Sequence, residues 1–290
     1  MFPLTYSTVL LSLVTASSTS MIWLYLSGKI RNSALTTTTT TEKEDKINKK
    51  DRVIGTNTQF VKYVVSVQYW NYHLCGAAII TDKWIISSAQ CYHYRRGKVN
   101  GYRAIGGLHF LGETRSINQY VNISRVVIHP RFYYSEKCRQ IASDIALLEL
   151  VSPFLLDKFV DKIQLPLIRQ SFTGRATVSG WGGYRSGAVP LGRVNITLLS
   201  YEECVEQNKL NNLTAKITMH KSMICGYPVE NNHTVCRSDV GSPLVQGDTL
   251  IGIASFAQVC VITLGGKYIS LYTKVSRYIN FINKYVKDLY

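Results

Sequence analysis

Most of the chain after residue 53 alternates short apolar runs with turn-forming residues. The runs are rich in β-branched and aromatic side chains, and glycine, asparagine, aspartate and proline separate them. Clear examples are residues 63–69, 77–80, 84–87, 121–128 and 250–256. Many short strands with frequent turns are typical of an all-β sandwich or barrel. Only the C-terminus breaks this rhythm, because apolar residues at helical spacing predict one closing amphipathic helix there. These residues are Val275, Ile279, Ile282 and Val286.

The first 52 residues have a different composition. Residues 1–27 hold two mostly apolar runs and precede the first charged residue, Lys29, which predicts a secretory signal peptide. The alternative is an uncleaved signal anchor of a type II membrane protein, because roughly 20 apolar residues can span a bilayer. Residues 28–52 contain a threonine run followed by a charged stretch, which is typical of a flexible linker or pro-segment.

Cysteines and glycosylation sequons both favour an extracellular protein. The chain has seven cysteines but no Cys-x-x-Cys pair, which fits disulfides in an oxidising compartment better than a zinc site. The sequence also contains Asn-x-Ser/Thr acceptor sites for N-linked glycans, at Asn122, Asn195, Asn212 and Asn232. We expect a secreted glycoprotein without a metal ion or other cofactor.

The formal net charge is +15, so the protein should attract anionic surfaces. The densest basic cluster consists of Arg95, Arg96, Lys98 and Arg103. It is interpreted either as a solvated basic loop or as a site for anionic glycans or an acidic partner. Nucleic acid is not expected as a partner, because no recognition motif is present.

Three segments have the surroundings that nucleophilic hydrolysis of a peptide bond requires. They are Trp84-Ile85-Ile86-Ser87-Ser88-Ala89-Gln90-Cys91, Ser143-Asp144-Ile145-Ala146-Leu147-Leu148 and Cys236-Arg237-Ser238-Asp239-Val240-Gly241-Ser242-Pro243-Leu244. In this order they resemble the histidine, aspartate and serine motifs of the trypsin/chymotrypsin-like (S1) serine protease family. The resemblance covers residues 53–290. It implies two six-stranded antiparallel β-barrels, perpendicular to each other, with the active site between them and a C-terminal α-helix.

The chain departs from the family at two catalytic positions. Gln90 stands where the family has its histidine, and Val240 stands where it has its serine. Valine has no nucleophilic atom, and a glutamine amide does not accept a proton near neutral pH. Asp144 is retained, and we expect the Gln90 amide to donate a hydrogen bond to it, much as imidazole would.

The resemblance assigns roles to several further residues. Arg52 and Val53 match the activation cleavage site, and Asp239 matches the aspartate that pairs with the new N-terminal amine. The remnant of the specificity pocket consists of Thr234, Ser255, Phe256 and Ala257. Thr234 replaces the aspartate with which trypsin-like enzymes bind basic side chains. The implied disulfides join Cys75 to Cys91, Cys204 to Cys225 and Cys236 to Cys260, which leaves Cys138 unpaired.

The sequence therefore predicts a non-catalytic secreted protease homologue, similar to those of insects. Its role would be binding or regulation in a proteolytic cascade, immunity or a reproductive secretion, with another secreted or cell-surface protein as partner. One alternative is an active serine endopeptidase with relocated catalytic residues, drawn from His93, Ser238 and Ser242. Another is a membrane-anchored adhesion protein.

Overall fold

The computed structural model describes residues 60–95, 97–135, 140–182, 189–210, 217–230, 235–256, 269–287 and 289. The chain divides into two units, residues 1–44 and 45–290, and all described residues belong to the second. None of the helices in this part is long and apolar enough to cross a membrane.

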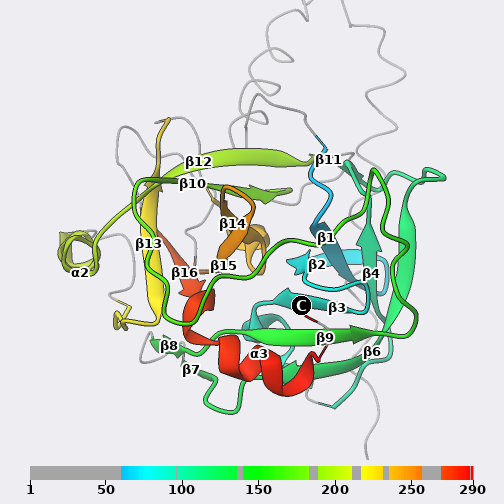
Figure 1. Ribbon diagram of the computed structural model, residues 1–290, viewed down its shortest axis with the longest axis horizontal. Helices are drawn as coiled ribbons and strands as arrows, with labels where there is room; N and C mark the ends of the chain where they lie inside the picture. The colour runs from blue at the N-terminus through cyan, green and yellow to red at the C-terminus, as the bar shows by residue number, and fades with distance from the viewer. Residues whose placement is uncertain are drawn as a thin grey trace, which may run out of the picture. The chain divides into compact units, whose positions relative to one another are not determined.

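Two closed six-stranded antiparallel barrels form the fold (Figure 1). The first contains, in order around the barrel, β1 (Val64–Tyr69), β2 (Tyr72–Ile79), β3 (Trp84–Ser87), β9 (Ala146–Leu150), β6 (Gln119–Ile128) and β4 (Tyr102–Gly106). The second contains β10 (Arg175–Gly180), β12 (Gly192–Leu198), β13 (Met223–Pro228), β16 (Ser270–Lys274), β15 (Thr249–Phe256) and β14 (Pro243–Gln246). The all-β prediction and the two six-stranded barrels are confirmed.

Short elements complete the connections. Two small sheets pair β5 (Phe110–Leu111) with β11 (Val189–Pro190) and β7 (Tyr133–Ser135) with β8 (Gln140–Ala142). The 3₁₀-helices are η1 (Ala89–Cys91), η2 (His93–Arg95), η3 (Arg237–Asp239) and η4 (Val275–Arg277). The α-helices are α2 (Tyr201–Leu210) and α3 (Ile279–Tyr285).

The predicted C-terminal helix is present as η4 followed by α3. Ile279 and Ile282 of α3 are buried in one apolar cluster with Ile86 of β3, Leu147 of β9 and Ile253 of β15. The helix therefore packs on strands of both barrels, and its apolar spacing exists because it covers this shared core.

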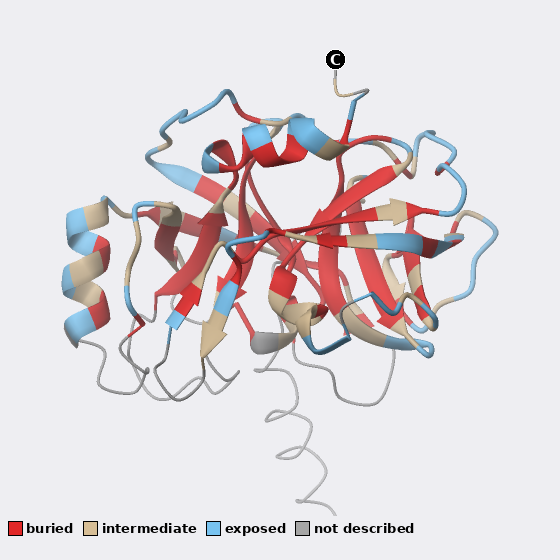
Figure 2. Cartoon of the chain, turned by 90° about the horizontal axis from the view of Figure 1, so that it is seen from below, coloured by how far each residue is buried: buried red, intermediate tan, exposed pale blue. Residues whose placement is uncertain are grey.

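The second helix, α2, corrects the prediction that only the C-terminus would be helical. The buried residues among its described side chains are Cys204 and Asn208, and Figure 2 shows the helix largely exposed at the edge of the molecule. Its start is a capping box, because Ser200 Oγ accepts a bond from Glu203 N (3.2 Å) and Glu203 Oε2 accepts one from Ser200 N (2.8 Å). With so little apolar surface, the helix leaves hardly any hydrophobic periodicity in the sequence.

Candidate functional site

Asp144 lies at the centre of a buried hydrogen-bond network just before β9. Its carboxylate accepts bonds from Ser88 Oγ (2.7 Å), Ser255 Oγ (2.6 Å), Gln90 N (2.8 Å) and Gln90 Nε2 (2.7 Å). Asp144 is only 2% exposed, and burial raises the pKa of its carboxyl group, while these hydrogen bonds act in the opposite direction. Ser255 belongs to β15 of the second barrel, so the network joins the two barrels.

The Gln90 side chain is held by two acceptors at once. Its Nε2 donates to Asp144 and also to the carbonyl oxygen of Ser255 at 2.5 Å. The expected bond between Gln90 and Asp144 is confirmed. The amide thus makes the contact that an imidazole N–H would make, but it has no basic nitrogen with which to accept a proton.

Val240 follows η3 in a loop fixed by backbone hydrogen bonds. Its carbonyl oxygen accepts from Gly76 N (2.9 Å), and Gly241 N donates to the carbonyl oxygen of Ala254 (2.7 Å). Gly241 has a φ of +86°, and a Cβ there would lie 2.2 Å from the carbonyl oxygen of Gly76, so this position requires glycine. The Val240 side chain is 6% exposed and is packed rather than presented to solvent.

Asp239 is fully buried beside this loop. Its carboxylate accepts hydrogen bonds from Gly182 N and Cys236 N, both at 2.8 Å. Burial raises the pKa of Asp239 to about 6. The ion pairs of the described chain involve other carboxylates, Glu113 with Arg115 and Glu149 with Arg125. Its predicted partner Val53, like Arg52, lies outside the described residues.

His73 of β2 is a site residue that the sequence reasoning did not single out. Its Nδ1 is hydrogen-bonded to Ser66 Oγ (2.8 Å), and its Nε2 lies 3.3 Å from the carbonyl oxygen of Ser238. Desolvation lowers the pKa of His73 to about 4, so the ring is neutral at pH 7. The sequence does carry one signal for this contact. It places a serine within the predicted strand of residues 63–69, where a buried polar side chain needs a hydrogen-bond partner, and a histidine shortly after that strand.

The residues considered as replacement nucleophiles are occupied or enclosed. Ser238 Oγ donates to the carbonyl oxygen of Gly182, and Ser242 is 1% exposed with no hydrogen-bond partner for its hydroxyl among the described residues. His93 Nδ1 is bonded to the carbonyl oxygen of Gln90 at 2.8 Å. Neither serine hydroxyl is hydrogen-bonded to a histidine in the part of the chain that the structure describes.

The specificity-pocket remnant is described only in part. Ser255 is buried in the Asp144 network, and Phe256 is partly buried against an apolar cluster that contains residues of both barrels. Thr234 and Ala257 lie outside the described residues.

Both disulfides whose cysteines are all described are present, Cys75–Cys91 and Cys204–Cys225. Cys236 is also disulfide-bonded, while its predicted partner Cys260 lies outside the described residues, as does Cys138.

Two of the sequon asparagines are described. Asn122 on β6 and Asn195 on β12 are both exposed. Asn212 and Asn232 lie outside the described residues.

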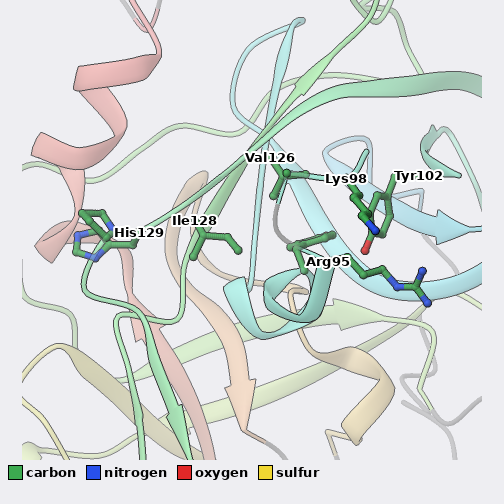
Figure 3. A pocket seen from close by; sticks show the side chains of 9 residues that line it. Arg95, Lys98, Tyr102, Val126, Ile128 and His129 are labelled. Atoms are coloured by element: carbon green, nitrogen blue, oxygen red, sulfur yellow. The ribbon is translucent and has the colours of Figure 1, made fainter. Parts of the chain in front are cut away.

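The basic cluster of the sequence is divided between two pockets. Arg95 and Lys98 border one cavity of about 230 Å³, in which Val126 and Ile128 separate them from His129 (Figure 3). Arg103 lines a different pocket, where its Nε and Nη2 both donate to Gln68 Oε1 (3.1 and 2.8 Å). The Arg95 guanidinium lies 4.1 Å above the Tyr69 ring and donates to its hydroxyl. Arg96 lies outside the described residues.

Twin six-stranded barrels with histidine, aspartate and serine positions at their junction define a chymotrypsin-like serine protease scaffold. The trypsin family model matches residues 53–282. Rat trypsin V-B is 31% identical over 243 residues, which cover 81% of this chain and 90% of the relative. Rat trypsin V-A is 30% identical over 245 residues, with 82% and 91% covered. Trypsin-2 of Salmo salar is 30% identical over 192 residues, with 65% and 76% covered. The chain belongs to the trypsin (S1) family of serine proteases.

Proposed function

We propose that this trypsin-family protein is a non-catalytic, secreted binding or regulatory protein. The observation that carries the proposal is the pair of substitutions at the Asp144 site, Gln90 for the general base and Val240 for the nucleophile. Because triad members act as a unit, loss of even one lowers kcat by roughly a million-fold. The intact network around Asp144 supports a scaffold that is retained for a purpose other than hydrolysis.

The test is covalent labelling of the purified secreted chain with a fluorophosphonate probe, which reacts with activated serines. We expect no labelling and no cleavage of peptide substrates under conditions in which an active trypsin is fully labelled. The double variant Gln90→His/Val240→Ser is a matched comparison, since it returns both groups to the same scaffold. Labelling of the unmodified chain would favour the alternative, an endopeptidase with relocated catalytic residues, and would reject the proposal.

The proposed partner is another secreted or cell-surface protein, in a proteolytic cascade, immunity or a reproductive secretion. Anionic glycans are a second class of ligand at the basic cluster, where Lys98 is exposed and lines a pocket. The engagement of Arg95 and Arg103 with Tyr69 and Gln68 leaves these guanidinium groups less available to a ligand.

Secretion and N-glycosylation belong to the same proposal and are supported by the exposed positions of Asn122 and Asn195. N-terminal sequencing of secreted material distinguishes a cleaved signal peptide from the alternative of a membrane-anchored adhesion protein. A secreted chain that begins after residue 27 is the expected result.

A further inference from the structure

A third cavity, of about 570 Å³, is lined by three arginines, and none of its described lining residues is acidic. Arg131 follows β6, Arg169 precedes β10, and Arg277 ends η4, so segments distant in sequence bring the three arginine residues to one hollow. His220 and Asn280 add further polar groups to its wall. This volume lies within the roughly 300–1,000 Å³ that is typical of ligand pockets.

The positive charge of this arginine cavity is not neutralised within the described chain. Its arginines take part in neither of the ion pairs, which are Arg115 with Glu113 and Arg125 with Glu149. The pKa of Lys274 is lowered by burial and, in addition, by the charge of Arg277. Burial and the charge of Arg131 act in the same way on the pKa of His129. Arg277 and Arg131 thus each raise the positive potential around them, and an anion placed in the cavity would lower it.

Asp144, the acidic residue closest in sequence to a residue that lines the cavity, already has hydrogen-bond partners elsewhere. Ser143 lines the cavity, and the neighbouring Asp144 directs its carboxylate to Ser88, Gln90 and Ser255 instead. Among the described residues, therefore, no carboxylate is paired with the three arginines, and an anionic ligand is suited to balance their charge.

Exposed apolar residues on the segment of Arg169 indicate what kind of anion fits. Leu167 is 73% exposed and Ile168, which lines the cavity, is 55% exposed. Two adjacent exposed aliphatic residues beside arginines suit a peptide that carries both carboxylates and an apolar side chain. A sulfated glycan would satisfy the arginines but would leave these aliphatic surfaces without an apolar partner.

We propose that the arginine cavity binds an acidic segment of a partner protein. Carboxylates of the segment would pair with Arg131, Arg169 and Arg277, in the bidentate geometry that guanidinium groups favour. An apolar side chain of the segment would cover Leu167 and Ile168. The inference goes beyond the proposed function, since such a segment would bind here whether or not the Asp144 site is catalytic.

The test measures binding of a synthetic peptide of glutamates and aspartates around a central leucine to the full secreted chain by fluorescence anisotropy. The variant Arg131→Glu/Arg277→Glu should bind at least about tenfold more weakly, because two charge-assisted contacts become repulsive. The control Lys62→Glu/Arg175→Glu changes the net charge by the same amount at exposed positions outside the cavity and should remain within about threefold of the unmodified chain.

The apolar contact has its own readout. Ile168→Ser should weaken binding about threefold at both low and high salt, because the hydrophobic contribution is not screened as charge pairs are. If the charge-reversal variant does not fold, Arg131→Gln/Arg277→Gln, checked by circular dichroism, tests the same contacts.

Equal losses in the cavity and control variants would overturn the proposal, since net charge alone would then explain binding. Absence of any binding of the peptide to the unmodified chain would also overturn it. Tighter, cavity-dependent binding of a sulfated oligosaccharide of the same charge would show that the class of partner is wrong. None of these outcomes depends on whether the chain has protease activity.

Discussion

Asp144 keeps a full set of hydrogen-bond donors although the catalytic histidine and serine positions of the family are Gln90 and Val240 here. In the trypsin family this aspartate orients the histidine, and here four donor groups still converge on its carboxylate. A buried charge without partners would be costly, so the Gln90 amide does more than fill space. It adds a third donor to Asp144 Oδ2, beside Ser88 Oγ and Ser255 Oγ, and a smaller or apolar residue at position 90 would remove that donor.

The variant Asp144→Asn should lower the free energy of unfolding by about 1–3 kcal/mol, because one carboxylate oxygen becomes an amide group that faces existing donors. Denaturation in urea measures the effect. Asp82→Asn is the matched control, since Asp82 is exposed and its substitution should change the free energy by less than about 0.5 kcal/mol. Equal stability of the two variants would mean that the network contributes nothing.

The hydrogen-bonding capacity of single residue types predicted the bond between Gln90 and Asp144. It did not predict that His73 also belongs to the site. The bond from Gln90 to Asp144 follows from replacing one N–H donor by another. The contact of His73 with Ser66 and Ser238 does not follow from local sequence, because it depends on the register of β1 with β2 and on a loop from the second barrel. Contacts between barrels require the docked structure.

At the scale of elements, the sequence was most informative where an element is buried against a core. Residues 84–87 coincide with β3, residues 250–256 fall within β15, and the apolar spacing from Val275 onward gives η4 and α3. The exposed α2 lacks such a pattern, and only the Ser200–Glu203 capping box marks its start. Hydrophobic patterns thus predict elements that cover a core, whereas exposed helices depend on signals at their ends.

Because α3 covers a core shared by both barrels, truncating its buried face should destabilise the whole fold. Ile282→Ala should cost about 2–5 kcal/mol of unfolding free energy, since Ile282 is fully buried and leaves a cavity. Asn283→Ala, at the neighbouring exposed position, should cost less than about 0.5 kcal/mol. Unfolding followed by fluorescence and circular dichroism checks both values. A similar small loss in both variants would contradict the role of α3 in joining the barrels.

At the scale of the whole molecule, we expect Asp239 to connect the loop of Val240 with cleavage at Arg52, if the new amine at Val53 pairs with its carboxylate. Its folded pKa of about 6 lies above the ordinary value of 3.8, so the folded chain binds this proton more tightly than the unfolded chain does. The contribution of Asp239 to stability is therefore greatest at low pH and declines as the pH rises between these two values, by on the order of 2–3 kcal/mol. A cation beside the carboxylate would lower its pKa and remove the decline.

Cleavage that creates an amine at Val53 should have this effect if the amine pairs with Asp239. An enteropeptidase site ahead of Val53 makes a single cut possible through the substitutions Asn48→Asp, Lys49→Asp, Lys50→Asp and Arg52→Lys. Unfolding free energies of cut and uncut chains, measured between about pH 4 and pH 7, should diverge, with the cut chain more stable at the upper end. The pKa values of His73 and His129 are lowered to about 4, so these two residues make the free energy of unfolding rise with pH. Because they act equally in the cut and uncut chains, the result is the difference in unfolding free energy between the two chains.

A control chain with an alanine inserted before Val53 produces a displaced amine after the same cut. It should keep the pH profile of the uncut chain, because the added residue prevents the amine from reaching Asp239 in the same geometry. Asp239→Asn should remove the difference between the cut and uncut profiles, since no carboxyl group remains to titrate there. Superimposable profiles for cut and uncut chains would mean that Val53 does not pair with Asp239, and the cleavage site would then carry no conformational switch.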